Sequence, residues 1–522
     1  MTVLRCCIAA LAALVLSTGF SDAGERGSGG HKWRGKHGTH EHGVPSSTVG
    51  TAFLPGRAGY FDTVWPSEHT DLWRSHAVPG AGLPAGFDRK RLTVSSVGLN
   101  LPMWGYTRAR DEVFVIGGQP VALDTFTRAY VAGQHLTKQE FTASFVGSLL
   151  NPSVPYVAKI QPSGMRLVQR AFLQQGSTVN YTGGLLMHRN GFVYAVSRSV
   201  LYKIDPSSMN IARTLELPLV SGAHPFDSFW TTYNGLQVVA SGRLVLKGYH
   251  LLNSPSAQGW LLQVDPDDLS IAVQQQEPVL SARITIDPDM DGKTWLYHVN
   301  GTESLRYEIT DSGFDLDESW TREYRSDDSP NTQASSQLVF GKIGRVVFAD
   351  DTLPEPATGF KLYTQPDDRS APPGPLTGVP AFDRDVPGFN FYMIAGDPFE
   401  SQVVVYYDPV NGLLSAHRVH PDGFLEPMWQ RDQYRPSASP AISPDRDHLY
   451  IDDFRGDRDE FVVLRLSTGD ELARVTLDAT LPTVGTIFLG MNEDVYIIST
   501  QTGGANGLVS RVHVGTKSSR RH

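Results

Sequence analysis

Three aspartates, Asp287, Asp289 and Asp291, stand at alternate positions of the segment DPDMDG and are followed by Gly292. Carboxylates at this spacing before a glycine are typical of the first half of a calcium-binding loop. A loop of the hand type also needs a bidentate glutamate at its twelfth position, which counted from Asp287 is His298. Two interpretations follow: a turn between two strands, which the missing ligand favours, and a weak calcium site formed by the three aspartates.

Histidine is the second residue type in the chain that could bind a metal. Imidazoles brought together from different parts of a fold can hold iron or copper, and the candidates for such a site are His188, His224, His298 and His448. A second set could capture copper, zinc or nickel from the N-terminal segment, namely His31, His37, His40 and His42. A simpler interpretation is favoured for both sets, because the first lies mostly in or beside predicted turns and the second lies in a glycine-rich linker.

The segment AHPFDSFWTTYNG, residues 223–235, gathers side chains that suit ligand binding. It holds His224, Asp227, Trp230 and Tyr233, followed directly by Asn234. Imidazole, carboxylate, hydroxyl and amide groups beside an aromatic ring fix the orientation of a polar ligand. We predict that this segment is a functional loop, with packing of Trp230 between structural units as the alternative.

Other chemistries lack their motifs. The sequence has no Gly-x-Ser-x-Gly elbow, no P-loop and no His-Glu-x-x-His, which disfavours the corresponding esterases, nucleotide-binding proteins and metalloproteases. The net charge of −10 disfavours nucleic-acid binding, which usually needs a basic surface.

The N-terminus has the pattern of an export signal. Arg5 precedes the apolar run CCIAALAALVL, and small residues follow up to Ala23. No later segment approaches the roughly 20 apolar residues of a membrane span. We therefore predict a signal peptide over residues 1–23 and a secreted or periplasmic mature chain without a membrane span. Because Cys6 and Cys7 both lie in the signal, the mature chain would contain no thiol and no disulfide.

Composition divides the rest of the chain. Residues 24–50 are polar and glycine-rich and are expected to form a disordered tail. Residues 51–90 contain aromatic residues and recurrent prolines without a period, and we predict an extended arm that packs on a folded body. Residues 91–515 form that body, and residues 516–522 are a basic C-terminal tail.

A repeat runs through residues 91–515. A polar turn followed by a β-rich run recurs at intervals of about 50 residues, with one longer first interval that suggests an insertion. The runs are RDEVFVIGG, RNGFVYAVS, ASGRLVLKG, MDGKTWLYHVN, KIGRVVFADD, DRDHLYIDD, NEDVYIIST and a weaker instance at residues 388–396. A second signal, apolar residues followed by Asp-Pro, occurs at residues 201–209, 261–269 and 404–412, where we expect one strand to end and another to begin.

Units of this length with four strands cannot bury their faces alone, but they can do so by packing side by side into a closed ring. The sequence thus predicts an all-β protein, a β-propeller of seven or eight four-stranded blades. The segment NGFVYAVSRSVLYKIDPSSM, residues 190–209, resembles the blade repeat of quinoprotein-like and YVTN-type propellers. The segment AISPDRDHLYIDD, residues 441–453, resembles the inner hairpin of such blades.

This resemblance implies the fold and leaves the activity open, because one fold carries many chemistries. A quinone-dependent dehydrogenase would place calcium and an acid at the channel, and many of the alcohol-oxidising type carry a vicinal disulfide that the mature chain cannot form. A quinone cofactor is therefore disfavoured, and calcium remains open.

In a propeller, residues just before each innermost strand line the mouth of the axial channel. Here they are mainly hydroxyls and amides, with one guanidinium that could pair a carboxylate or sulfate. The binding candidates at this mouth are His224, Asp227, Trp230, Tyr233, Asn234, Arg283, Tyr181 and Gln333.

We predict a monomeric exported protein that binds a small polar ligand or a protein partner at the channel mouth. The alternative is an enzyme at the same place, either a metal- or quinone-dependent oxidoreductase or a hydrolase or lyase.

Overall fold

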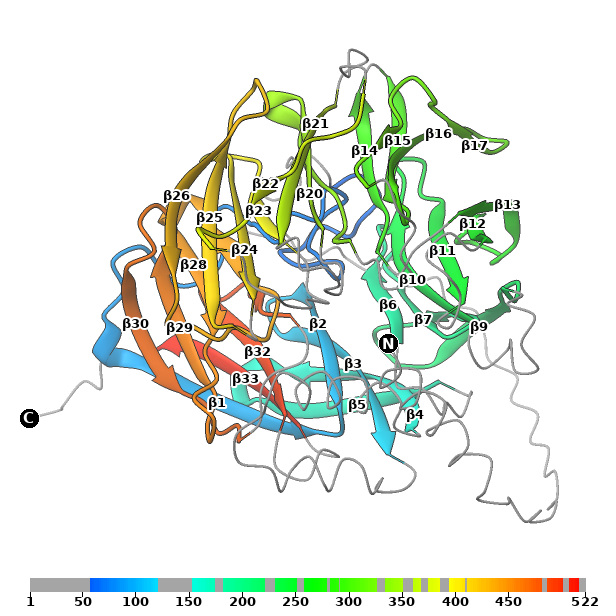
Figure 1. The fold of residues 1–522 in the computed structure, drawn as a ribbon. Coiled ribbons are helices and arrows are strands. Elements are labelled where there is room, and N and C mark those ends of the chain that lie inside the picture. Colours follow the sequence, from blue (N-terminus) through cyan, green and yellow to red (C-terminus); the bar gives the residue numbers. More distant parts are fainter. Residues whose placement is uncertain are drawn as a thin grey trace, which may run out of the picture. The chain divides into compact units, whose positions relative to one another are not determined.

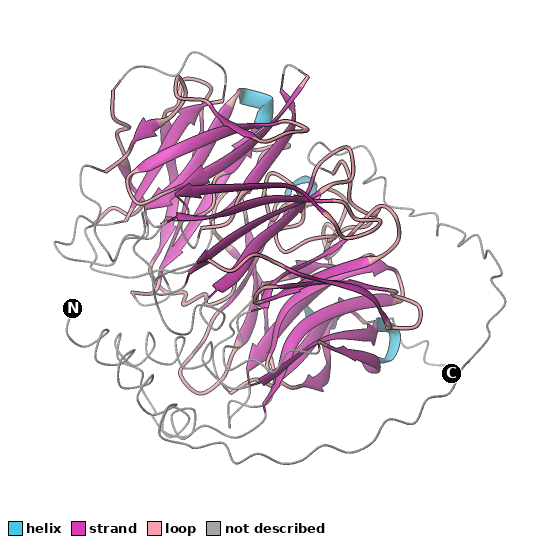
Figure 2. Ribbon diagram, turned by 90° about the vertical axis from the view of Figure 1, so that its right-hand side faces the viewer, coloured by secondary structure: helices cyan, strands magenta, loops and turns pink. Residues whose placement is uncertain are grey.

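Short β-branched and aromatic runs separated by turns give an almost purely β structure (Figure 2). The computed structural model describes residues 57–120, 153–173, 182–220, 231–250, 258–278, 282–290, 292–325, 334–350, 360–367, 374–384, 394–408, 411–480, 486–500 and 507–515. Within these ranges the helices are four single 3-10 turns: η1 (Arg89–Arg91), η2 (Pro162–Gly164), η3 (Gly341–Ile343) and η4 (Pro444–Arg446).

The strands form eight antiparallel sheets, the blades, whose strands follow one another in chain order except in the last blade. Blade 1 contains β2 (Pro102–Ala109), β3 (Glu112–Pro120), β4 (Ser153–Gln161) and β5 (Arg166–Phe172). Blade 2 contains β6 (Thr182–Met187), β7 (Val193–Ser197), β8 (Val200–Ile204) and β9 (Ile211–Glu216). Blade 3 contains β10 (Thr231–Val238), β11 (Leu244–His250), β12 (Gln258–Val264) and β13 (Ile271–Pro278). Blade 4 contains β14 (Thr285–Met290), β15 (Lys293–Val299), β16 (Glu303–Ile309) and β17 (Phe314–Leu316), and the short β18 (Arg322–Glu323) also pairs with β16.

The second half repeats this pattern. Blade 5 contains β19 (Leu338–Phe340), β20 (Arg345–Asp350), β21 (Lys361–Pro366) and β22 (Val379–Pro380). Blade 6 contains β23 (Ala395–Asp397), β24 (Val403–Asp408), β25 (Leu413–Val419) and β26 (Leu425–Arg431). Blade 7 contains β27 (Ala441–Ser443), β28 (His448–Asp452), β29 (Glu460–Arg465) and β30 (Glu471–Thr476). Blade 8 contains β31 (Phe488–Leu489), β32 (Asp494–Thr500), β33 (Gly507–Val514) and β1 (Leu92–Leu99).

Blade 8 joins the two ends of the repeat region. Its outermost strand, β1, comes from the start of that region and pairs with β33 from Leu92 opposite Val514 to Leu99 opposite Gly507. The ring of blades is also closed at the inner strands, since Ser439 before β27 bridges Thr486 before β31, and β31 packs against β2. The chain is therefore an eight-bladed β-propeller, as the repeat predicted (Figure 1).

The repeat signals fall where a propeller needs them, with two exceptions in blade 6: the weak run at residues 388–396, and the Asp-Pro signal at residues 404–412, which follows the second strand, β24, and not the third. The Asp-Pro pairs at 205–206 and 265–266 lie between the third and fourth strands of blades 2 and 3. The long first interval has its insertion between β3 and β4, because residues 121–152 separate them. The weak run at residues 388–396 was the wrong counterpart in blade 6, where the second strand is β24 at residues 403–408.

The segment before the first strand lies at the inner strands of the blades. Residues 57–83, here called the arm, are almost entirely buried and follow no repeat (the blue trace inside the ring in Figure 1). Trp65 exchanges hydrogen bonds with Thr107 of β2, and the amide of Phe61 donates to the carbonyl of Met187 in β6. Further along, the amide of Ile286 in β14 donates to the carbonyl of Leu72.

The arm reaches the remaining blades in the same way. The hydroxyl of Tyr60 donates to Gln237 of β10, and Trp73 packs on Gly341 after β19. The amides of Gly396 in β23 and Ile442 in β27 donate to carbonyls of the arm, and the hydroxyl of Thr63 lies 3.6 Å from the sulfur of Met491 after β31. The arm therefore contacts the inner strands of all eight blades.

Candidate functional site

The middle of the arm is a compact loop over residues 67–76. Its backbone closes on itself through hydrogen bonds from Thr70 to the carbonyl of Ser67 and from His76 to the carbonyl of His69. Thr70, Arg74 and His76 have φ values of 70°, 58° and 59°. Residues without a glycine's freedom rarely adopt this left-handed backbone, and such strain often accompanies functional sites. The loop therefore holds buried charged side chains in a fixed, strained frame.

Glu68 is the centre of a buried ion cluster. Its Oε1 lies 2.5 Å from Nη2 of Arg283, which precedes β14, and its Oε2 lies 3.4 Å from Nη2 of Arg74. Nε2 of His69 lies 3.8 Å from the same carboxylate, and Nδ1 of His69 contacts Nε2 of His76. The arm and the channel wall thus meet through one carboxylate and two guanidinium groups, all removed from solvent.

Further cationic and aromatic groups surround this cluster. The guanidinium of Arg283 lies over the ring of Trp104 in β2, 5.2 Å from its centroid. Lys247 of β11 is buried and its ammonium donates to the carbonyl of Ala282, the residue before Arg283. A cation stacked on an aromatic face gains electrostatic energy and leaves its donor edge for a second partner.

Burial and mutual repulsion govern the titration of these groups. Burial lowers the pKa of Arg74 to about 10; Glu68 opposes this shift and Arg283 adds to it. Burial, with repulsion from Arg283 and Arg74, also lowers the pKa of Lys247 well below its ordinary value. Burial lowers the pKa of His76 to about 3, with a further contribution from Arg74, and the pKa of His69 is also well below its ordinary value.

These pKa shifts disfavour acid–base catalysis at the cluster and leave binding as the better-supported role. A general base works best when its pKa is near the working pH, and both imidazoles are neutral and weakly basic at neutral pH. The cations, by contrast, repel one another across a buried site. The arrangement therefore suits the binding of an anionic group better than proton transfer.

Three of the predicted binding residues lie within the described ranges, and only Arg283 belongs to the cluster. Tyr233 of β10 is buried in the apolar core, and its hydroxyl donates to the carbonyl of Pro218 at 2.6 Å. Asn234, also buried, pairs in register with Lys247. His224, Asp227, Trp230, Tyr181 and Gln333 lie outside the described residues, and their roles stay predictions.

The cluster contains residues that the sequence reasoning missed, namely Glu68, His69, Arg74 and Lys247. A signal for the first three was present in the sequence. SEHTDLWRSH, residues 67–76, places several charged or imidazole side chains between aromatic anchors, which is unusual for a segment that only covers apolar surface.

The aspartates of the predicted calcium loop occupy the hairpin between β14 and β15, where Met290 pairs with Lys293. Asp287 is buried in β14 and accepts a hydrogen bond from the indole of Trp73 at 3.2 Å. The side chain of Asp289 and the whole of Asp291 lie outside the described residues, so the calcium site stays a prediction. The predicted turn between two strands is present.

Asp287 forms a buried carboxyl pair with Asp367, which follows β21. Burial, together with repulsion from Asp287, raises the pKa of Asp367 to about 7. The hydroxyl of Tyr297 in β15 donates to Asp367, and Nη1 of Arg306 donates to its carbonyl at 2.5 Å. Two adjacent carboxyl groups in a dry site favour sharing one proton, so this pair joins blades 4 and 5 and holds the Trp73 end of the arm.

The predicted histidine site has no support among the described imidazoles. His188 lies between β6 and β7, His298 near the end of β15 and His448 at the start of β28, so each is in a different blade. In the described ranges no three histidine, cysteine, aspartate or glutamate side chains are grouped as metal ligands would be. His224 and the four tail histidines are not among the described residues.

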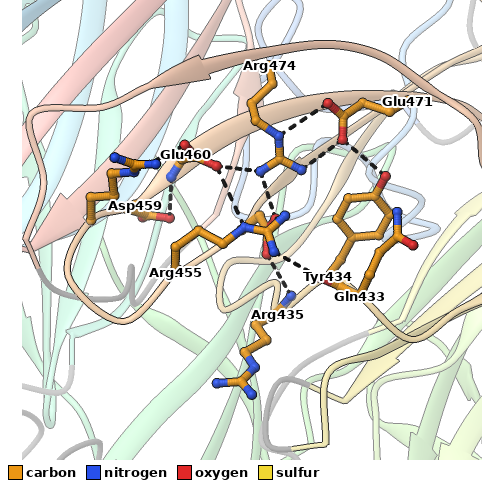
Figure 3. Close-up of polar contacts among 10 residues, drawn as sticks. Gln433, Tyr434, Arg435, Arg455, Asp459, Glu460, Glu471 and Arg474 are labelled. Carbon is orange, nitrogen blue, oxygen red and sulfur yellow. Dashed lines mark hydrogen bonds and ion pairs between the residues drawn. The ribbon is translucent and has the colours of Figure 1, made fainter. Parts of the chain in front are cut away.

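A second charged network lies in blade 7 (Figure 3). Arg474 of β30 contacts Glu471 at 2.7 Å, Asp453 at 2.8 Å and Glu460 at 2.5 Å, and Arg455 contacts Asp453 at 2.5 Å. Burial alone would lower the pKa of Arg474, but these hydrogen-bonded carboxylates raise it above its ordinary value. Because its opposite charges contact one another directly, this network stabilises the blade and is a weaker candidate for ligand binding.

No helix in the described part of the chain is long and apolar enough to cross a membrane.

Comparison with known proteins supports the fold alone. No family model and no curated protein matches the chain. Among solved structures, the quinohemoprotein alcohol dehydrogenase from Comamonas testosteroni is similar with a TM-score of 0.56 and 9% identity, covering 91% of this chain and 85% of that one. A quinohemoprotein alcohol dehydrogenase from Pseudomonas putida HK5 gives a TM-score of 0.56 and 10% identity, covering 88% and 81%. These similarities confirm the expected likeness to quinoprotein propellers at the level of architecture.

Proposed function

We propose that this exported propeller binds a small polar ligand with an anionic group in the axial channel, at Arg283, where the arm meets the channel wall. The observation that carries the proposal is the meeting of Arg74 and Arg283 at Glu68, with the buried Lys247 bonded to the carbonyl of the residue before Arg283. An anionic group placed beside Arg283 would reduce the repulsion among these cations, and the nearby Trp104 offers an apolar face for the rest of the ligand.

Binding is favoured over the alternative of a channel-mouth enzyme for a chemical reason. The described imidazoles of the cluster have low pKa values, which makes them poor general bases at neutral pH. The carboxyl pair of Asp287 and Asp367 titrates in a more useful range, but its groups already accept hydrogen bonds from Trp73 and Tyr297, which gives the pair a structural role.

A thermal-shift screen with small carboxylates, inorganic phosphate, sulfate and neutral sugars tests the proposal. We expect an anion to raise the melting temperature of the wild-type protein, because a ligand that binds only the folded state stabilises it. The shift should disappear in Arg283→Gln and persist in Arg458→Gln, whose side chain is exposed outside the channel.

Loss of Arg283 would leave Glu68 buried beside one cation fewer, which could unfold the variant. The double variant Arg283→Gln/Glu68→Gln removes both charges, so loss of anion binding in it cannot be caused by an unpaired Glu68. If anions stabilise the double variant as strongly as the wild type, or only neutral sugars stabilise the wild type, the proposed site is wrong.

A further inference from the structure

Glu68 contacts the same guanidinium that the proposed ligand would use. Its Oε1 lies 2.5 Å from Nη2 of Arg283, so the two opposite charges form a close, buried ion pair. Its second oxygen is farther from Arg74, at 3.4 Å. The arm therefore already presents a carboxylate to the channel wall, in the position that an external carboxylate would need.

The loop that carries Glu68 is held independently of that contact. Ser75 donates its amide to Oδ1 of Asp71 at 3.0 Å, and its hydroxyl donates to Oδ2 of the same carboxylate. Arg57 ties the start of the arm by donating to the carbonyls of Thr63 and Val64, each at 3.0 Å. Because these bonds do not involve Glu68, they would remain if its side chain turned away from Arg283.

Glu68 also has a second place for its charge. Arg74 and His69 lie on the same loop, with Nη2 of Arg74 at 3.4 Å and Nε2 of His69 at 3.8 Å from Oε2. A Glu68 side chain released from Arg283 would remain beside Arg74. The exchange would therefore avoid leaving a buried carboxylate without a partner, which is the costly outcome for a buried ion pair.

Resting on the proposed function, we propose that Glu68 is an internal competitor and that the ligand is a small carboxylate that takes its place on Arg283. The planar guanidinium fork matches a carboxylate in two parallel hydrogen bonds. Binding replaces the Glu68 carboxylate with that of the ligand. The affinity of the wild-type site for the ligand is therefore reduced by the free energy needed to break the contact between Glu68 and Arg283. Glu68 thus sets the threshold for binding and selects against neutral ligands, which cannot replace its charge.

The test compares Glu68→Gln with the wild type for acetate, propionate and succinate, with acetamide and propionamide as neutral counterparts. The glutamine keeps the size of the side chain and removes its charge. Isothermal titration should show at least about tenfold tighter carboxylate binding by Glu68→Gln, and the carboxylate should produce a larger thermal shift in the variant. The amides should bind neither protein more tightly.

Glu471→Gln provides the matched control, because Glu471 also pairs with an arginine, Arg474, but lies in blade 7. Its carboxylate affinity should equal that of the wild type. Unchanged or weaker carboxylate binding by Glu68→Gln, including no binding by either protein, overturns the competitor role. If Glu68→Gln has its native melting curve and only weaker binding, Glu68 is a ligand contact instead.

The two proposals fail in different ways. If Arg283→Gln/Glu68→Gln loses anion binding while Glu68→Gln binds no better than the wild type, the anion site stands and the competitor role falls. If the double variant binds anions like the wild type, the anion site itself is wrong.

Discussion

The indole N–H of Trp73 donates a hydrogen bond to Oδ1 of Asp287 at 3.2 Å, although the two residues are 214 positions apart in the sequence. This bond ties the arm to blade 4. It also engages the first aspartate of the acidic DPDMDG segment in an internal contact, and Asp287 in turn neighbours Asp367. One hydrogen bond thus connects the arm, blade 4 and the carboxyl pair between blades 4 and 5.

Replacing Trp73 with phenylalanine should destabilise the protein by about 2 kcal/mol, because a buried carboxylate loses a hydrogen bond. Urea unfolding followed by circular dichroism measures the change. The control is Trp429→Phe, which removes a 2.8 Å bond to the uncharged carbonyl of Leu466 and should cost less. Equal stability of Trp73→Phe and the wild type would show that the Trp73–Asp287 bond contributes nothing.

The carboxyl pair predicts a pH dependence of stability. The folded-state pKa of Asp367, about 7, lies above the ordinary value of 3.8, so between these values the folded protein holds a proton that the unfolded chain has lost. Stability from this group is therefore full below about pH 4 and falls as the pH rises toward 7. Asp367→Asn, which stays neutral while its oxygen can still accept from Tyr297, should lack this fall.

The measurement is the free energy of unfolding of both proteins from pH 4 to pH 8, and the informative quantity is their difference. Asp367→Asn should gain stability relative to the wild type as the pH rises. Parallel curves would mean that Asp367 titrates normally in the folded state.

The junction of blades 1 and 8 should be sensitive to a single methyl group. An added Cβ on Gly105 of β2 would collide with the ring of Phe488 in β31. Gly105→Ala should therefore lower the free energy of unfolding by about 1–3 kcal/mol through overpacking. Gly98→Ala is the matched control, because a Cβ at Gly98 of β1 meets open space, and its effect should stay within about 0.5 kcal/mol. Similar unfolding curves for the two variants would contradict the tight packing at this junction.

The charged network in blade 7 should depend mainly on its buried members. Asp453 is fully buried and contacts Arg474, so Arg474→Gln should cost about 2 kcal/mol, less than a wholly buried pair because Arg474 is partly exposed. Arg458 is 57% exposed where it contacts Glu460, and Arg458→Gln should change stability by at most about 0.5 kcal/mol. Chemical unfolding of both variants measures the two losses of stability. A larger loss in Arg458→Gln than in Arg474→Gln would show that the exposed member of the network contributes more than the buried one.

The architecture could be read from the sequence because each blade repeats local signals. Runs such as RNGFVYAVS mark second strands, and Asp205-Pro206 and Asp265-Pro266 mark turns between strands. These features depend on neighbours a few residues away. The misplaced run is in blade 6, where Asp-Pro follows the second strand, β24, and not the third as in blades 2 and 3, so β24 was assigned to a later position of the blade.

The candidate site was harder to predict for a physical reason. Arg283 could be picked out because it precedes an inner strand, but its partner Glu68 lies on an arm that meets the blades at scattered points and therefore has no period. Lys247 stands in the middle of a second strand, where position alone favours a core role. Only the packing of the arm against the adjacent blades 3 and 4 brings these charges together.

The pairing of β1 with β33 has a consequence for how the protein is made. β1 is synthesised early, but its partner β33 is synthesised last, since Leu92 pairs with Val514 and Leu99 with Gly507. β1 therefore has no partner until the last blade has been made. During that interval the edge of β1 has no partner and is open to pairing with other chains. The arm's contacts with Ile442 of β27 and with Met491 after β31 also need the last two blades, so completion of the circle and full seating of the arm both come late in biogenesis.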